Sequence, residues 1–144
     1  MPLPLIREGT LGALYQTPRS ARLLNGRPTG HALGDGGVWP GNLIIRPGSR
    51  SRNMMFPDVG RYFLVDDILD FAGLNLKTGA LVLPIRLALG EQGRTLGGLG
   101  RATLRGTIFD LFSGIQEMAS DTERHGSADV CTWVVTGLEI VRPA

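Results

Sequence analysis

The residue types that most often carry catalysis are sparse in this chain. It has two histidines, His31 and His125, and one cysteine, Cys131. Neither a His-Glu-x-x-His nor a Cys-x-x-Cys spacing occurs, so a catalytic zinc site would need carboxylates from scattered loops. The alternation of Cys131 with Trp133 is typical of a strand and indicates a small buried side chain instead of a nucleophile. These residues predict no catalytic site and no cofactor.

The stretch 125-HGSAD-129 places a histidine, a serine and an aspartate within five positions. A Ser-His-Asp triad usually takes its three side chains from separate elements, whose geometry the fold fixes. No G-x-S-x-G turn occurs in the chain. We therefore interpret this stretch as a surface turn capped by Ser127 or Asp129.

Three carboxylates stand close together at Asp66, Asp67 and Asp70. If the stretch is helical, positions three or four apart lie on one face, and paired carboxylate oxygens could hold a divalent cation. Acidic residues at the start of a helix are, however, also favoured by the helix dipole and are commonly solvated. We predict no metal site here.

Two glycine-rich stretches invite a phosphate-binding interpretation. Residues 97-GGLGRA-102 lack the third glycine of G-x-G-x-x-G and fall in a predicted strand. Residues 73-GLNLKTG-79 have leucine where a P-loop requires glycine, and no helix is predicted to follow. Neither stretch predicts a phosphate site, and the glycines at 97, 98 and 100 favour a bent strand or a close backbone approach.

The strongest candidate for binding is the basic segment 46-RPGSRSRNMMFPDVGR-61. Its Met54, Met55 and Phe56 belong to residue types that are enriched at protein interfaces. We predict a docking segment that contacts acidic residues of another copy. The predicted interface comprises Arg46, Arg50, Arg52, Met54, Met55, Phe56 and Arg61, with Glu117, Asp121 and Glu123 as acidic partners.

The same segment has an alternative interpretation as a nucleic-acid-binding surface. Its arginines could follow a phosphate backbone while a neighbouring aromatic ring stacks on a base. The RNP1 signature is absent, and the net charge of +2 is low for such a domain. The residues of this alternative are Arg46, Arg50, Arg52, Arg61 and Tyr62.

Charge is unevenly distributed between the two parts of the chain. Residues 1–61 contain eight arginines against three carboxylates, a balance of +5, and residues 62–144 contain seven basic residues against ten carboxylates, a balance of −3. This asymmetry predicts a head-to-tail contact between copies, of the kind that closes into rings or extends into filaments. Burial of the two methionines and Phe56 would supply most of the energy, while the arginines fix orientation.

Composition predicts one soluble domain. The 144 residues are 42% hydrophobic and 19% charged, and 21 glycines and 9 prolines indicate many turns. The N-terminus lacks the pattern of a secretory signal, no apolar run is long enough for a membrane helix, and a single cysteine suits a reducing compartment. We predict a single domain over 1–144, with a loop-rich arm at 1–41 and an α+β core at 42–144.

A hairpin is the clearest element. Residues 79–90 alternate strictly between apolar and other positions, as do residues 94–106, which predicts two antiparallel strands around 90-GEQG-93. Leu83, Ile85 and Leu87 are expected in the core. Pro84 cannot donate a ladder hydrogen bond, so we expect an edge strand or a bulge there.

The other elements follow from weaker patterns. Residues 42–48 predict a short strand, 61–75 a short helix after one or two strand residues, 107–121 an amphipathic helix, and 128–143 a strand with a bulge at Gly137. Together these predict an α+β fold. It has a mainly antiparallel sheet or partly closed barrel of four to five strands, two short helices and a long loop-rich N-terminal arm.

Without a catalytic motif, the sequence favours a non-enzymatic structural subunit of a symmetric homo-oligomer. A component of a phage-like virion (a tail, connector or capsid-stabilising protein) would fit, with other assembly proteins as further partners and no membrane contact. The alternatives are the nucleic-acid-binding module described above and a small β-rich enzyme or ligand-binding barrel. The expected location is the cytoplasm or a virion.

Overall fold

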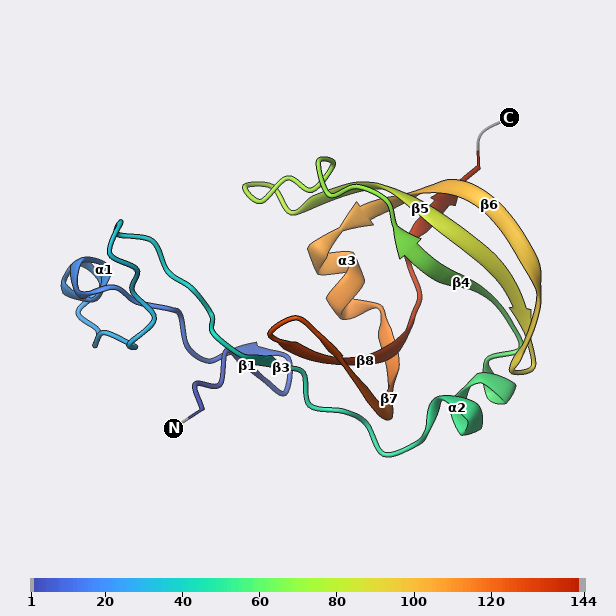
Figure 1. Cartoon of the computed structure of the whole chain (residues 1–144), viewed down its shortest axis with the longest axis horizontal. Coiled ribbons are helices and arrows are strands. Elements are labelled where there is room, and N and C mark those ends of the chain that lie inside the picture. Colours follow the sequence, from blue (N-terminus) through green and yellow to red (C-terminus); the bar gives the residue numbers. More distant parts are fainter. Residues whose placement is uncertain (1, 143–144) are drawn as a thin grey trace. The chain divides into compact units, whose positions relative to one another are not determined.

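The computed structural model describes residues 2–142 (Figure 1). It has an α+β fold with mostly antiparallel sheets and a few short helices, as the sequence predicts. None of the described sheets closes into a barrel, so that alternative is wrong. The chain divides into two compact units: unit 1 is residues 1–44 with 125–129, and unit 2 is residues 45–124 with 130–144.

Unit 1 contains short elements only. Within the described residues its strands and helix are β1 Ile6–Arg7, β2 Thr10–Leu11, α1 Pro18–Leu23 and β3 Leu43–Ile44. β1 and β2 form a two-stranded antiparallel sheet, and β3 pairs in parallel with the start of β8 (Ala128–Val135). The predicted arm 1–41 falls within this unit.

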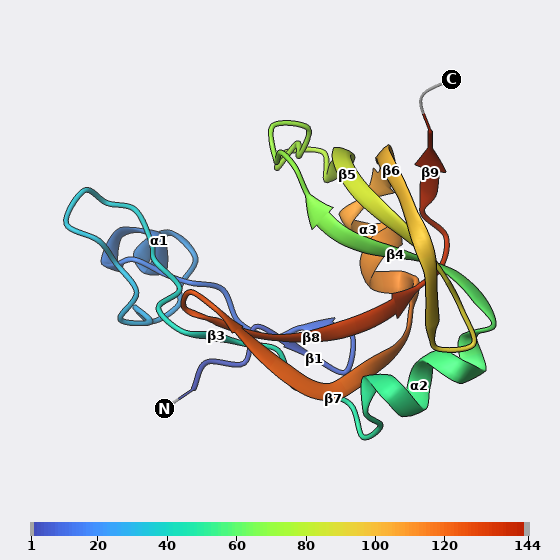
Figure 2. The same cartoon turned by 45° about the vertical axis from the view of Figure 1, so that its right-hand side comes forward.

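Unit 2 holds the hydrophobic core. Its elements are α2 Arg52–Val59, β4 Arg61–Ile68, β5 Ala80–Glu91, β6 Arg94–Thr107, α3 Ile108–Ser113, most of β7 Ile115–His125, most of β8, and β9 Glu139–Val141. One sheet has the strand order β4-β5-β6-β9, and the other has the order β3-β8-β7 (Figure 2). No helix within residues 2–142 has the length and apolar character needed to cross a membrane.

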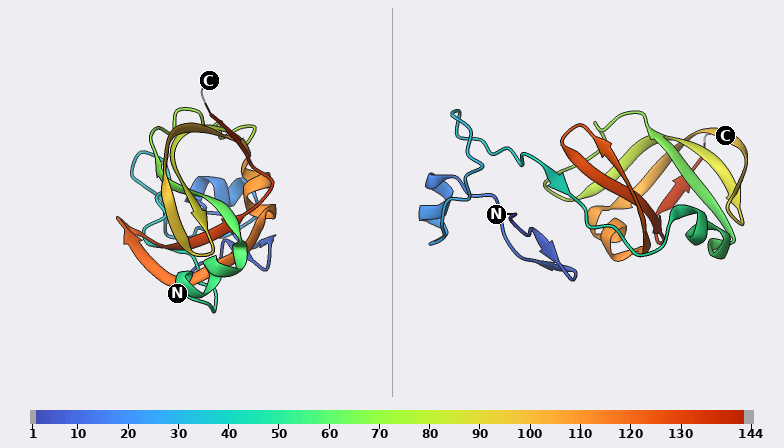
Figure 3. Two further views of the ribbon diagram at one scale, coloured as in Figure 1. Left: turned by 90° about the vertical axis from the view of Figure 1, so that its right-hand side faces the viewer. Right: turned by 60° about the horizontal axis from the view of Figure 1, so that its bottom comes forward.

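The predicted hairpin is confirmed by the pairing of β5 with β6 (Figure 3). Glu91 pairs with Arg94, and Gln92 and Gly93 between them have φ of +48° and +82°, as a two-residue type I′ turn requires. Leu83, Ile85 and Leu87 are buried together with Leu81 and Ala102. The alternating face therefore forms the main core, as expected.

The expected edge strand is wrong, because β5 lies between β4 and β6, and no bulge occurs there, because its pairing with β6 is regular at Pro84. The ladder between β4 and β5 ends at Ile85, however, so Pro84 lies just beyond it. The backbone N–H of Leu69 donates to the Pro84 carbonyl at 2.8 Å. A residue's nitrogen and carbonyl point to the same side of an antiparallel strand. The Pro84 nitrogen therefore faces the point where β4 ends, so the missing N–H costs no ladder hydrogen bond.

The helix predicted in 61–75 is also wrong, since residues 61–68 form β4 and pair antiparallel with β5. The apolar residues of this stretch fit both helical and strand spacing. Pairing decides between them, because a bare β5 edge would leave a row of backbone donors and acceptors without partners. The register shifts between Val65 and Asp67, which makes Asp66 the extra residue of a bulge.

The helix predicted over 107–121 is correct only at its start. Helix α3 ends at Ser113, and the chain continues as strand β7. At Gly114 a Cβ would lie 2.0 Å from the Thr136 carbonyl oxygen, so glycine allows the chain to pass close to that backbone. The expected bulge at Gly137 is instead a break: its φ is +83°, and β8 and β9 belong to different sheets.

Helix α3 begins with a reciprocal cap. The Asp110 backbone N–H donates to Thr107 Oγ1 at 3.0 Å, and the Thr107 backbone N–H donates to the Asp110 carboxylate at 2.8 Å. We expect Thr107→Ala to lower the free energy of unfolding by about 1 kcal/mol, because one backbone donor of the helix loses its partner. Urea unfolding measures the change, and a Thr107→Ser variant, which keeps the hydroxyl, should lose much less. Equal losses in the two variants would show that the cap contributes nothing.

Candidate functional site

The predicted docking segment is tied to its own chain by Arg50. Its guanidinium donates to the Asp58 carboxylate, to the Met54 carbonyl at 2.6 Å and to Glu117 on β7 at 3.3 Å. The hydrogen bond with Asp58 is the largest cause of a raised pKa of Arg50, and Glu117 adds to it electrostatically. The Arg50 carbonyl also accepts from Ser120 N–H at 2.7 Å. The segment before α2 therefore runs along β7.

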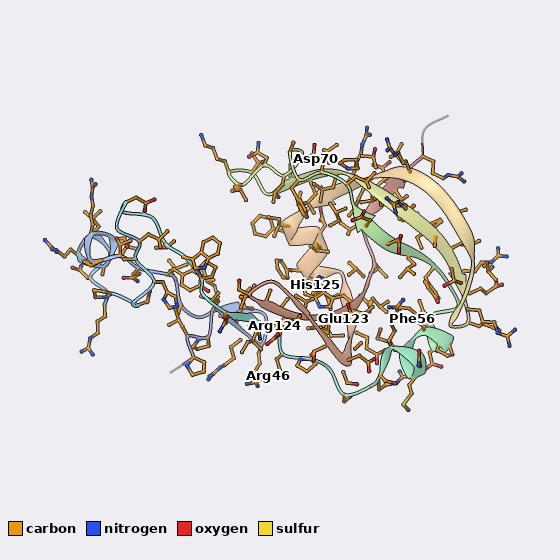
Figure 4. The ribbon with its side chains drawn as sticks, in the orientation of Figure 1. Arg46, Phe56, Asp70, Glu123, Arg124 and His125 are labelled. Atoms are coloured by element: carbon orange, nitrogen blue, oxygen red, sulfur yellow. The ribbon has the colours of Figure 1, made fainter. Side chains whose placement is uncertain are left out.

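Helix α2 contributes to the core where a docking loop was predicted. Met55 is fully buried and Phe56 is 8% exposed, and both pack in a cluster with Ala119. Phe56 is labelled on α2 in Figure 4. Burial of Met55 and Phe56 is already complete within the chain, so they cannot supply energy to a contact between copies. Of these three residues only Met54, which is 63% exposed, could bury apolar surface in a contact between copies.

The acidic partners predicted on another copy are largely used within the chain. Glu117 pairs with Arg50, and the Asp121 carboxylate accepts the backbone N–H of Arg52. Glu123 and Arg46 are both exposed in unit 2 (Figure 4). Glu117 and Asp121 therefore both have partners in the same chain, and a head-to-tail contact that uses them stays a prediction.

The arginines of the nucleic-acid alternative do not form a free row. Arg61 Nε donates to Glu91 at 2.8 Å, and Arg52 lies 4.9 Å from the centre of the Phe56 ring. Tyr62 is half-buried against the same Phe56 ring, with centroids 4.8 Å apart. These contacts engage one N–H donor of Arg61 and the rings of Phe56 and Tyr62 within the chain.

The residues considered for catalysis are distributed over several elements. His31 packs against the Tyr15 ring at 4.5 Å in unit 1, His125 ends β7, and Cys131 is half-buried in β8. Gly126 and Ser127 form an exposed turn between β7 and β8, which confirms the predicted surface turn. Its capping by Ser127 or Asp129 and the absence of a nucleophile stay predictions.

The three neighbouring aspartates are on a strand and its exit, not on a helix. Asp66 and Asp67 approach Arg86 on β5 at 3.9 and 3.6 Å, and the Asp70 carboxylate accepts the Ala72 N–H at 2.9 Å. Across residues 2–142, no group of three or more His, Cys, Asp or Glu side chains gathers in a way that could hold a metal ion.

The sequence interpretation missed the outer edge of β4, which is the first strand in its sheet. The Gln92 N–H donates to the Gly60 carbonyl at 2.8 Å, which makes Arg61 and Glu91 a non-hydrogen-bonded pair. Alternate residues from there, Arg61, Phe63 and Val65, therefore point their backbone N–H and C=O groups away from β5. Within the described residues no other strand pairs with this edge.

Two apolar side chains accompany this backbone edge. Phe63 is 52% exposed and Val65 is 40% exposed. They pair with Leu89 and Leu87 of β5, so all four side chains lie on the same face of the sheet. An extended chain lying against β4 would find alternating backbone donors and acceptors together with two apolar contacts. That combination is the one by which sheet edges bind peptides.

Comparison with protein families assigns the fold. Residues 1–142 match the model of the PmbA/TldA metallopeptidase C-terminal domain. The chain belongs to this family. A solved structure from Thermotoga maritima, of a protein described as a candidate modulator of a DNA gyrase, superposes with a TM-score of 0.88 at 23% sequence identity. That match covers 95% of this chain and 32% of the other, so this chain spans about a third of its length. No curated protein sequence matches the chain.

Membership of the PmbA/TldA family overturns the function predicted from sequence. A non-enzymatic virion or assembly subunit is wrong, because the family model covers nearly the whole chain and describes a metallopeptidase domain. The error came from treating Met55, Phe56 and the arginines as an exposed surface. Neither comparison supports a virion location, virion partners or nucleic acid.

The family description implies a metal, so the donor set of this chain decides whether it fits one. A catalytic zinc site needs three protein ligands that converge. Residues 2–142 offer no such convergence, and Asp66 and Asp67 are directed to Arg86. The described residues of this PmbA/TldA-type domain do not fit a metal centre, and we assign no metal-dependent step to them.

Proposed function

We propose that this chain acts as the C-terminal domain of a PmbA/TldA-type peptidase, in which its part is to hold an extended peptide along the outer edge of β4. The family match supports peptide chemistry. The observation that carries the proposal is the outward-facing backbone of Arg61, Phe63 and Val65.

The edge suits a peptide because its backbone groups can bind any extended chain, whatever its sequence. Main-chain hydrogen bonds supply affinity in this mode, and pockets or patches for alternate side chains supply preference. Phe63 and Val65 would favour apolar side chains at two alternate positions of the bound peptide. Arg61 is paired with Glu91, so it adds little net charge to this edge.

A labelled, unstructured peptide with alternating apolar residues tests the proposal by fluorescence anisotropy. We expect Phe63→Ala to weaken binding about tenfold, the effect of losing roughly 1.4 kcal/mol of contact. Phe109→Ala is the matched control, since Phe109 is an exposed phenylalanine on α3. It should leave affinity unchanged.

The backbone is tested separately with peptides that are N-methylated at alternate positions. One set of positions should abolish binding and the other should preserve it, because only every second amide of an edge-bound strand faces β4. Equal affinity of both peptides, or equal loss with Phe63→Ala and Phe109→Ala, would rule out β4 as the binding edge.

Self-association and a cytoplasmic location remain predictions from the sequence. Self-association is consistent with the family, and a head-to-tail pairing through Glu117 and Asp121 would compete with the partners that both carboxylates have within the chain. Any contact between copies that uses the predicted segment would involve its exposed side chains, such as Met54 and Arg46.

A further inference from the structure

On the outer face of β6, Arg101 lies opposite another positive charge. Arg101, Thr103 and Arg105 alternate along the strand and so share one face. Arg105 lies across from Glu139 on β9, whereas Arg101 lies directly across from Arg86 on β5. Like charges that face each other on neighbouring strands repel, so the second pair needs compensation.

Compensation is present for only one member of that pair. The Arg86 guanidinium approaches Asp66 at 3.9 Å and Asp67 at 3.6 Å. Among the described residues no carboxylate lies within 4.0 Å of Arg101, and its side chain is exposed. The Arg101 guanidinium therefore faces the like charge of Arg86 with no described carboxylate within 4.0 Å to offset its own charge.

Beside Arg101 the sheet is hollowed. The hollow has a volume of about 240 Å³ and is lined by Pro84, Arg101, Ala102, Thr103, Val141 and Arg142. Arg142 Nη2 donates to the Leu99 carbonyl at 3.4 Å, which engages one of its five N–H donors. Two guanidinium groups and a hydroxyl thus border a floor of apolar side chains.

We propose that this hollow binds a carboxylate that is joined to a small apolar group. A guanidinium presents parallel N–H donors that match the two oxygens of a carboxylate. Pro84 and Val141 offer apolar contact to the carbon next to that carboxylate. Two sources share this chemistry: the C-terminal residue of a peptide and an acidic side chain. None of the lining residues belongs to the β4 edge, so carboxylate binding here is tested independently of the proposed peptide binding at β4.

The test uses N-acetylalanine as the carboxylate probe and N-acetylalaninamide as its uncharged counterpart, with binding followed by amide chemical shifts of the full chain. We expect N-acetylalanine to bind and its amide to show no binding. Arg101→Gln and Arg142→Gln should each weaken binding at least tenfold. Arg105→Gln is the matched control, since Arg105 is on the same strand and face but opposite Glu139, and it should bind as the wild type does.

A second readout separates a binding role from a structural one. Without ligand, Arg101→Gln should keep or raise the melting temperature, because it removes the repulsion with Arg86. N-acetylalanine should raise the melting temperature of the wild type but not that of Arg101→Gln. A stabilisation by the probe that survives in Arg101→Gln would overturn the site.

Further arms identify the source of the carboxylate. A short peptide with a free C-terminus is compared with its C-terminally amidated form, and with an amidated form that carries an internal glutamate. Binding of either carboxylate-containing peptide, lost in Arg101→Gln, supports the site and names its source. Equal binding of the amidated peptide without glutamate, equal loss in Arg105→Gln, or tighter binding of inorganic phosphate would overturn the proposal.

Discussion

Ile85→Asp is expected to lower the free energy of unfolding by about 4 kcal/mol or more, because it places a charge without a partner in the core. Ile85 is fully buried in the middle of β5, between Leu83 and Leu87, and α3 packs on the same core through Ile108 and Leu111. No polar or charged residue among those described is buried, so none is available to pair with the new charge. Urea unfolding followed by circular dichroism measures the loss.

Val82→Asp is the matched control for that substitution. Val82 is on the same strand but on its other face, and it is 48% exposed. Its aspartate would remain in water, so we expect a change within about 0.5 kcal/mol, the usual range for an exposed site. Similar losses in the two variants would mean that the alternation along β5 does not separate core from solvent.

Gly73→Ala is expected to destabilise the chain by about 3 kcal/mol, the upper part of the range for overpacking. A Cβ at this position would lie 1.9 Å from the Val82 carbonyl oxygen. The obstacle is backbone, which no side-chain rotation can clear. The same two residues are joined by a hydrogen bond from Val82 N–H to the Gly73 carbonyl at 3.0 Å, so moving them apart also breaks that bond.

Gly97→Ala shows whether the loss at Gly73 is steric. An added Cβ at Gly97 meets no atom within 4 Å, and the backbone there has no positive φ. The substitution should be neutral or slightly stabilising, since alanine reduces the freedom of the unfolded chain. Thermal unfolding of both variants gives the comparison. A destabilised Gly97→Ala alongside an unaffected Gly73→Ala would contradict the close approach of residues 73 and 82.

Sequence reasoning predicted the β5–β6 hairpin because its alternation has one explanation. Five leucine and isoleucine residues at every second position suit a strand, whereas in a helix they would be spread around all of its sides. The apolar residues of β4 fit both periods, and those of β7, Ile115, Met118 and Ala119, have helical spacing. There the choice depends on strand pairing, which joins residues far apart in the chain and leaves no local signal.

The candidate site was not predictable for a related reason. Whether a strand is an edge depends on the order of strands in the sheet, so nothing in Arg61–Ile68 alone marks an open edge. The exposure of the docking segment was wrongly predicted because its contacts are distant in sequence. Arg50 forms a hydrogen bond with Glu117, sixty-seven positions away, and Met55 packs against Ala119. A signal did exist in the aromatic and β-branched residues at positions 62, 63 and 65, which favour a strand.

Unit 1 differs from unit 2 in how strictly packing limits its sequence. Ala21 is its single fully buried hydrophobic residue among those described, whereas side chains such as Leu23 and Ile44 are mostly in contact with solvent. A buried position rejects most substitutions on volume alone, but an exposed one does not. Sequence drift in unit 1 should therefore be governed by its turns, its glycines and whatever it contacts. Homologues of this chain would then diverge faster there than in the β5–β6 hairpin.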